Sequence, residues 1–332
     1  MNQIVKYSIC IPNLNMENTI EVALRSVLDQ IDDEYEVIVV DDGSTDRSVE
    51  ILRSLELEYP NLFVHELPRD PNRILADTRN ISISFARGRY LLLHIDCDDY
   101  WYPYIQDFVK IYHQIEKFKG SQFLLSGHQV NMGEASFLRS HGPYKSGHMV
   151  EDRDMWYRLA RVGAYVPLDH VVFRERMKLT KKQRLRKIIL LTYIILSDEI
   201  RVGRTLKNVI SEIFSKDTNL SRKYRVFKVL VFPGAWFRAK IKGKLARNEY
   251  LEDWKILKSE AWSKSGTAAE LFNKAGMSFD DSTLTEAGTW IFGHSSREKT
   301  IEELPQELKS KCIGLHKKDK MDNNWGRQIS DC

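Results

Sequence analysis

Two hydrophobic patterns alternate along the first hundred residues. Short, mainly apolar runs cover residues 7–12, 35–40, 62–65 and 91–95, and runs of this length are typical of strands buried on both faces. Between them, apolar residues recur at helical spacing after each of the first three runs. Strands and helices in this alternating order predict a parallel α/β sheet that is flanked by helices.

Carboxylates follow two of these predicted strands. Residues 41–42 come directly after the second run, and three aspartates lie within residues 96–99, after the fourth. Crossovers between parallel strands are right-handed, so we expect these loops and Pro12–Asn13 to face one crevice. Three neighbouring acids repel one another and raise their own pKa values, and a divalent cation that prefers hard oxygen ligands, Mg²⁺ or Mn²⁺, would relieve this repulsion. A solvated Asp-rich turn is the alternative for one acidic cluster, but it does not readily explain two.

Two common nucleotide-binding motifs are absent from the sequence. Pro12–Asn15 stands where a dinucleotide-binding G-x-G-x-x-G would follow the first strand, and no Walker A sequence occurs. These absences disfavour a dinucleotide oxidoreductase and a P-loop ATPase. A nucleotide site that uses carboxylates and a divalent cation remains.

Five motifs in order resemble those of inverting family 2 glycosyltransferases of the GT-A fold, of bacterial or archaeal type. They are residues 8–17, 36–46, 76–81, 96–99 and 150–159. The resemblance covers roughly the first 175 residues and carries no information about the remainder. It implies a GT-A, Rossmann-like fold, with a mixed, mostly parallel sheet between helices.

The resemblance also implies which residues hold a nucleotide-sugar donor. Asp42 would accept a hydrogen bond from the base, for which uracil is favoured. Pro12 and Asn13 would hold the base and the ribose, with Glu17 close to them. Arg79 would reach the base or the diphosphate; a surface ion pair on a helix is the alternative for this residue. We interpret the neighbouring residue 41 as a turn-stabilising carboxylate.

Metal binding and catalysis are implied for four further acids. Asp96 would contact the ribose or the metal, and Asp98 would bind the Mg²⁺ or Mn²⁺ ion that bridges the two phosphates. Asp152 would be the base that activates the acceptor hydroxyl, with Glu151 as the second choice. An ordinary acidic helix start is the alternative for this pair. Arg174 and Arg176 would either close over the diphosphate or belong to a basic surface.

A strongly basic segment follows the predicted GT-A domain. Residues 178–247 hold 19 Lys and Arg against 4 Asp and Glu, whereas the whole chain has a net charge of only +4. Its apolar run, residues 188–196, is shorter than the ~18–20 residues that cross a bilayer. Residues 227–238 mix aromatic residues with flanking cations. Cation-flanked runs of this kind are typical of helices that lie on an anionic membrane surface. Packing into a protein core is the alternative for residues 188–196, and no nucleic-acid-binding motif is present.

We therefore expect three regions: a glycosyltransferase domain (1–177), a basic, membrane-associating helical region (178–247) and a C-terminal part (248–332). Within the last, residues 250–262 are predicted to be helical and residues 317–331 to be disordered. We assign no role to this part. The four cysteines lack a disulfide or metal spacing, which favours a reducing, cytoplasmic compartment.

The expected activity is transfer of a sugar from a nucleotide-sugar, preferably a UDP-sugar, to a hydroxyl of a glycan or lipid-linked acceptor at the inner face of the cell membrane. It would serve glycan or protein-glycosylation assembly. Two alternatives stay open. A nucleotidyltransferase would also place metal and nucleotide at this edge of a sheet, although it usually has a Gly-rich, basic loop after the first strand. A catalytically inactive, peripheral membrane-binding module would bind lipid without turnover.

Overall fold

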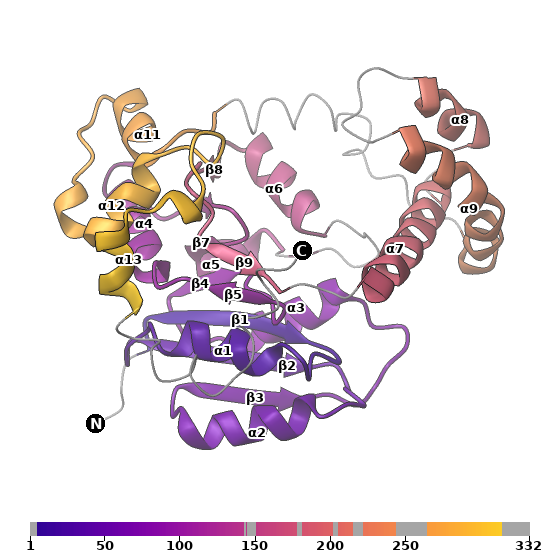
Figure 1. The fold of residues 1–332 in the computed structure, drawn as a ribbon, viewed down its shortest axis with the longest axis horizontal. Helices are drawn as coiled ribbons and strands as arrows, with labels where there is room; N and C mark the ends of the chain where they lie inside the picture. The colour runs from indigo at the N-terminus through magenta and orange to yellow at the C-terminus, as the bar shows by residue number, and fades with distance from the viewer. Residues whose placement is uncertain are drawn as a thin grey trace.

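A mixed, mostly parallel sheet forms the centre of the protein (Figure 1). The computed structural model describes residues 5–142, 144, 151–177, 181–201, 205–214, 222–243 and 264–313. The seven strands of the sheet have the order β3-β2-β1-β4-β7-β6-β8, and β7 runs opposite to the other six. The strands are β1 (Tyr7–Asn13), β2 (Tyr35–Asp41), β3 (Leu62–Glu66), β4 (Tyr90–Leu93), β6 (Leu124–Ser126), β7 (Asn131–Glu134) and β8 (Tyr165–Pro167). A two-stranded sheet pairs β5 (Asp99–Trp101) with β9 (Arg174–Arg176).

Helices cover both faces of the main sheet. The described helices of the whole chain are α1 (Ile20–Leu28), α2 (Ser48–Glu58), α3 (Leu75–Phe85), α4 (Ile105–Lys119), α5 (Ala135–Ser140), α6 (Glu151–Arg161), α7 (Lys181–Arg201), α8 (Leu206–Phe214), α9 (Arg222–Lys242), α11 (Ala268–Lys274), α12 (Glu286–Gly293) and α13 (Gln306–Ile313), with short 3₁₀ helices at Asp281–Thr283 and Ile301–Glu303. Along β1, Ile9 and Ile11 join a core cluster with α1, α2 and α4, whereas Cys10 joins a second cluster with α3, α5 and α6. This alternation along a strand places one hydrophobic core on each side of the sheet. The predicted α/β fold is confirmed.

The last strand before the acidic cluster is shorter than predicted. The apolar run reaches residue 95, but β4 ends at Leu93. His94 adopts a φ of 73°, in the left-handed region that non-glycine residues rarely occupy, and a strand cannot continue through it. The chain therefore turns at His94 and carries the following aspartates across the edge of the sheet.

The described part of the C-terminal region packs on the sheet domain. Phe272 of α11 and Ile291 and Phe292 of α12 belong to the core cluster of α1 and α4. The buried Asp107 carboxylate of α4 accepts hydrogen bonds from the backbone N–H and the hydroxyl of Thr285, at 3.1 and 2.6 Å. The helix predicted over residues 250–262 and the polar end at 317–331 lie outside the described residues, and the boundaries at 177 and 247 stay predictions.

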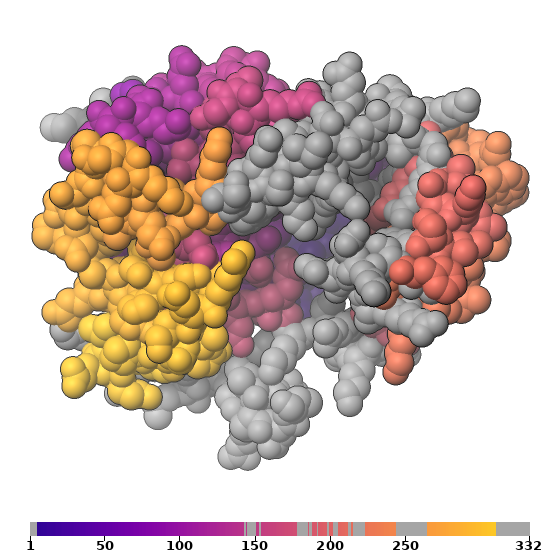
Figure 2. All heavy atoms as spheres, turned by 90° about the horizontal axis from the view of Figure 1, so that it is seen from above, coloured from indigo at the N-terminus to yellow at the C-terminus, as the bar shows by residue number. Residues whose placement is uncertain are grey.

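Helices α7, α8 and α9 pack on one another at the opposite end of the molecule from α11–α13 (Figures 1 and 2). Leu196, Val209, Phe232 and Ala235 form their shared small core. Packing into a protein core thus holds for Leu196, whereas the preceding residues 188–190 are 40–57% exposed. Among the described helices, none combines the length and the apolar character needed to span a bilayer.

Candidate active site

The carboxyl ends of β1, β2 and β4 meet at one edge of the sheet. A pocket of about 330 Å³ opens there. Its lining residues are Pro12, Asn13, Leu14, Met16, Asp42, Arg69, Arg73, Leu75, Thr78, Asp96, Cys97, Asp98 and Arg176. Five of the nine predicted site residues therefore share this pocket. The other four, Glu17, Arg79, Glu151 and Asp152, are not among its lining residues.

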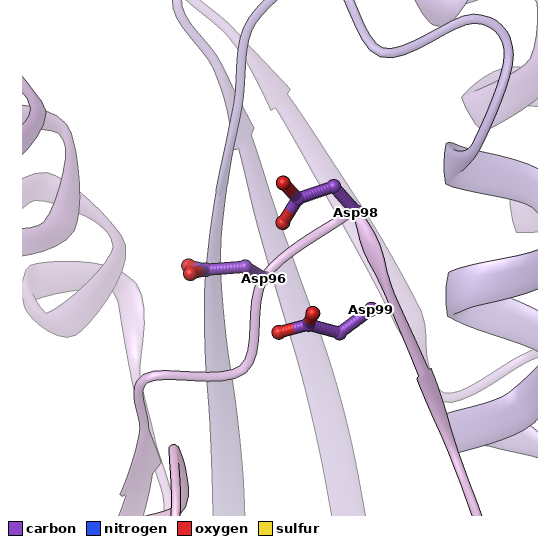
Figure 3. Close-up of side chains that lie close together, drawn as sticks. All are labelled: Asp96, Asp98 and Asp99. Atoms are coloured by element: carbon purple, nitrogen blue, oxygen red, sulfur yellow. The ribbon is translucent and has the colours of Figure 1, made fainter. Parts of the chain in front are cut away.

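Three aspartates form an acidic cluster at one side of this pocket. One carboxylate oxygen from each of Asp96, Asp98 and Asp99 lies within 4.8 Å of the others, and the three carboxyl groups project to the same side of the turn (Figure 3). Burial disfavours the charged form of Asp96, but Arg79, His94 and Arg176 outweigh this effect and lower its pKa. Oxygen ligands at this spacing fit a hard divalent cation such as Mg²⁺ or Mn²⁺. The donor set thus fits the predicted metal, with Asp99 as an additional acid.

Arg176 of β9 lies against all three acids. Its Nη2 is 3.4 Å from Asp98 Oδ1 and 3.8 Å from Asp96 Oδ2, and its Nε donates to Asp99 Oδ1 at 3.2 Å. Arg174 Nη1 donates to the same Asp99 oxygen at 2.7 Å. Asp99 is fully buried between these guanidinium groups, and burial raises its pKa although both arginines oppose the shift. Arg176 therefore supplies positive charge where a cation would bind.

A buried arginine connects the acidic cluster to the start of α6. Arg79, on α3, is only 4% exposed. Its Nη2 donates to Asp96 Oδ1 at 2.8 Å, its Nε lies 3.5 Å from Glu151 Oε1, and its guanidinium stands over the Tyr144 ring. A buried arginine that is shared by two acids on different elements is not the surface ion pair considered as an alternative. Arg79 positions Asp96 relative to Glu151.

The two acids at the start of α6 differ in their surroundings. Burial raises the pKa of Glu151, and Asp152 reinforces this effect while Arg79 opposes it. The Asp152 side chain is 22% exposed, and its Oδ2 lies 3.2 Å from His94 Nε2. His94 itself is 3% exposed and packs edge-to-face on Trp156. Asp152 therefore has a fixed partner on one side and access to solvent on the other.

A hydrogen-bond network orders the pocket wall at the ends of β1 and β2. Asp41 accepts hydrogen bonds from Asn13 Nδ2 at 2.7 Å and from the backbone N–H and hydroxyl of Ser44 at 2.8 and 2.6 Å. The predicted turn-stabilising role of Asp41 matches this geometry. Asn13 Oδ1, in contrast, is a buried acceptor that has no hydrogen-bond partner among the described residues. An unsatisfied acceptor of this kind at a pocket wall is suited to bind a ligand N–H or O–H.

Asp42 faces two arginines from the loop after β3. Arg69 Nη1 and Arg73 Nη1 lie 3.0 and 2.5 Å from its two carboxylate oxygens. The loop approaches closely because residue 43 is a glycine with a φ of +71°, where a Cβ atom would lie 2.6 Å from the Arg69 backbone. The predicted base-binding carboxylate is thus held by two cations that line the same pocket.

Glu17 lies beside the pocket wall rather than in it. Its Oε2 accepts a hydrogen bond from the backbone N–H of Arg47, just before α2, at 3.0 Å. Its own N–H donates to Asp46 Oδ2 at 3.1 Å. These contacts tie the β1 loop to the start of α2. A direct contact between Glu17 and a donor stays a prediction.

Three residues that contact the candidate site were not predicted from the sequence, namely Arg69, Arg73 and His94. A signal existed for each. The two arginines follow a strand that ends at the same edge of the sheet, and His94 is the single polar residue in an otherwise apolar run. Arg176 was considered, but its contact with the acidic cluster depends on the pairing of β9 with β5.

Comparisons with known proteins give several matches. Residues 8–161 match the family described as Glycosyl transferase family 2. The chain is 40% identical to the Poly(ribitol-phosphate) beta-glucosyltransferase of Bacillus spizizenii over 98 residues, which are 29% of this chain and 15% of that protein. It is 33% identical to the UDP-Glc:alpha-D-GlcNAc-diphosphoundecaprenol beta-1,3-glucosyltransferase WfgD of Escherichia coli over 94 residues, which are 28% of this chain and 35% of that protein.

Solved structures are similar at lower sequence identity. The structure of S. aureus TarS 1-349 in complex with UDP has a TM-score of 0.44 and 17% sequence identity, over 78% of this chain and 80% of that chain. The chain spans less than half the length of the two curated relatives named above.

Proposed function

Because residues 8–161 are a domain of glycosyl transferase family 2, we propose that the protein is an inverting, metal-dependent glycosyltransferase. It moves a sugar from a nucleotide-sugar, preferably a UDP-sugar, to an acceptor hydroxyl. One observation carries this proposal. The acids Asp96 and Asp98 line the same pocket as Asn13 and Asp42, and Arg79 joins Asp96 to the start of α6, where the candidate base lies.

The pocket wall supports the donor assignment. Its volume falls within the ~300–1,000 Å³ of typical small-molecule sites. Asn13 Oδ1 is an unsatisfied acceptor, to which the N3–H of uracil or a ribose hydroxyl would donate. Arg69, Arg73 and Arg176 line the same pocket and offer planar, bidentate donors to a diphosphate. In this proposal Asp42 orients the base. Arg69 and Arg73 either exchange their contact with Asp42 for a contact with the donor or keep Asp42 in place.

Asp96 and Asp98 would hold the Mg²⁺ or Mn²⁺ ion, and Asp99 would lie next to this pair. When bound, the ion would neutralise charge on the nucleoside diphosphate leaving group. Asp99 stays engaged by Arg174 and Arg176, so its role in this proposal is to hold β9 against the acidic cluster.

Asp152 acts as the base in this proposal. It takes the proton of the acceptor hydroxyl while that oxygen bonds to the anomeric carbon of the donor sugar. The bond from this carbon to the phosphate oxygen breaks, and its electron pair leaves with the nucleoside diphosphate. His94 orients the Asp152 carboxylate through the 3.2 Å contact. Glu151, whose pKa is raised by burial and whose carboxylate faces Arg79, is the second choice for the base.

A lipid-linked acceptor and a peripheral location at the cytoplasmic face of the cell membrane complete the proposal. The name of the relative WfgD states a diphosphoundecaprenol-linked acceptor, and that of the Bacillus spizizenii relative states poly(ribitol-phosphate). The basic composition of residues 178–247 supports a membrane surface nearby. The pathway would be glycan or protein-glycosylation assembly.

A thermal-shift panel tests this function. The full chain is mixed with UDP-, GDP- and ADP-sugars and with ATP, each with and without Mn²⁺. We expect a UDP-sugar to raise the melting temperature only when Mn²⁺ is present. A preference for ATP would instead favour a nucleotidyltransferase, and the absence of any nucleotide effect would favour an inactive binding module.

A further inference from the structure

Helix α9 carries apolar residues on two opposite faces. Phe232, Ala235 and Ala239 recur at helical spacing and are at most 9% exposed. Phe232 and Ala235 share a small core with Leu196 of α7 and Val209 of α8. Residues two positions apart on a helix point about 200° away from each other. The positions 226, 230, 237 and 241 therefore form a second row on the far side of α9.

This second row, which we call the outer stripe, is exposed to solvent. Val226, Leu230, Phe237 and Ile241 are 42%, 75%, 63% and 72% exposed. Pro233 falls in the same row and is also exposed. The row spans roughly 22 Å along the helix axis at ~1.5 Å per residue. Soluble helices normally place polar residues on this face. In the part of the chain that the structure describes, no segment buries the outer stripe.

The charged residues of α9 itself are all cationic. Helix α9 contains seven Lys and Arg and no Asp or Glu. Lys223, Lys240 and Lys242 are exposed, and Lys240 stands over the ring of Trp236, which is itself 46% exposed. Lys207 and the apolar residue Leu206 are also exposed at the start of α8. An apolar row that is flanked by lysines and an exposed tryptophan has the composition of a helix in the plane of a membrane interface.

We propose that the outer stripe of α9 lies on an anionic lipid membrane, with Leu230, Phe237 and Ile241 inserted among the lipids and the flanking lysines on the headgroups. This inference assigns the membrane contact of the proposed function to one face of α9, and it rests on that proposed function. The partner is a lipid surface rather than a second copy of the chain, because two copies of α9 facing each other would bring together two all-cationic helices.

Vesicle flotation of the full chain, without donor or metal, tests this inference. The vesicles contain equal parts of phosphatidylcholine and phosphatidylglycerol, or phosphatidylcholine alone. One variant combines Leu230→Gln, Phe237→Gln and Ile241→Gln. A matched control combines Leu57→Gln and Val162→Gln, two exposed apolar residues of the sheet domain, which are 92% and 63% exposed. A second variant combines Lys223→Gln, Lys240→Gln and Lys242→Gln.

We expect the unchanged chain and the control to float with the anionic vesicles. The stripe variant should partition at least about tenfold less, and the lysine variant should lose the preference for anionic vesicles. Equal flotation of the stripe variant and the unchanged chain would overturn the inference, as would no flotation of either. A change of oligomeric state in the stripe variant, seen by sedimentation, would assign the stripe to a second copy instead.

The measurements distinguish a failure of the proposed function from a failure of the membrane inference. UDP-sugar stabilisation with Mn²⁺ is measured on the same variants, whose changes lie outside the pocket. A chain that floats without binding any nucleotide-sugar would overturn the enzyme proposal alone. A chain that binds a UDP-sugar but stays at the bottom of the flotation gradient would overturn the membrane inference alone.

Discussion

His94 Nε2 lies 3.2 Å from Asp152 Oδ2, and this contact joins the turn after β4 to the first turn of α6. The turn exists because His94 adopts a left-handed backbone conformation. The pocket and the candidate base are thus linked through three neighbouring contacts: His94 with Asp152, Arg79 with Asp96, and Arg79 with Glu151.

The first prediction concerns the base. Asp152→Asn keeps the shape of the side chain but cannot accept the acceptor proton, so transfer should fall by at least ~10²-fold. Donor binding, measured by calorimetry with Mn²⁺, should persist because Asp152 does not line the pocket. Glu151→Gln is the comparison. If Asp152→Asn retains full activity and Glu151→Gln loses it, the base is Glu151.

The second prediction concerns His94 as a positioning residue. His94→Asn tolerates the left-handed backbone conformation but is too short to reach Asp152. We expect kcat to fall about tenfold or more through misplacement of the base, with the KM for the donor unchanged. Steady-state kinetics with varied donor and varied acceptor separate these effects. An unchanged kcat, or a loss confined to the donor KM, would contradict this role.

The third prediction concerns the acidic cluster. Asp98→Asn removes one negative oxygen from the candidate metal site, so it should abolish both Mn²⁺-dependent stabilisation by a UDP-sugar and transfer. Thermal shift with and without Mn²⁺ measures the first effect without turnover. Asp281→Asn, which changes an exposed acid that does not line the pocket, serves as control and should behave as the unchanged chain. Metal-dependent stabilisation that survives in Asp98→Asn would exclude this residue as a ligand.

The fourth prediction concerns Arg176. Its guanidinium lies within 4 Å of all three acids, where it competes with a divalent cation. Arg176→Ala should therefore bind Mn²⁺ more tightly without nucleotide, by roughly 5- to 30-fold for 1–2 kcal/mol of relieved competition. Its affinity for the UDP-sugar should fall, because a donor to the diphosphate is lost. Titration followed by the electron paramagnetic resonance signal of free Mn²⁺ gives the Mn²⁺ affinity. Unchanged or weaker Mn²⁺ binding by Arg176→Ala would refute competition between Arg176 and the cation.

The fifth prediction concerns acid stability. Burial lowers the pKa of His170 to about 3, and His128 reinforces the shift. An unfolded chain has a histidine pKa of about 6.5, so below this pH it takes up a proton that the folded chain does not. Stability should therefore fall as the pH decreases from about 6.5 toward 3, by about 2 kcal/mol at pH 5.

Urea unfolding at pH 7.5 and pH 5 measures this difference. His170→Gln should reduce the loss of stability between the two pH values, because glutamine does not titrate. His141→Gln, at an exposed position, is the matched control and should leave the loss unchanged. An equal loss in the His170→Gln variant and the unchanged chain would assign the acid sensitivity to other groups.

The sequence by itself determined the elements of the sheet and the loops that carry the site. Mainly apolar runs specify β1 to β4 because strands that are covered on both faces need apolar residues on both faces. Asp42, Asp96 and Asp98 were predicted to share a crevice from their positions after these runs, and they line one pocket.

Only the tertiary structure decided which partner each charged side chain contacts. The contacts of Arg176 with Asp98, of Arg73 with Asp42 and of Asp107 with Thr285 join segments that are distant in the chain. Such pairs depend on loop paths and strand pairing, which local hydrophobic periodicity does not encode. For the same reason the outer stripe of α9 was visible only once Phe232 and its neighbours were found buried, because apolar residues on all sides of a helix look alike in sequence until packing separates them.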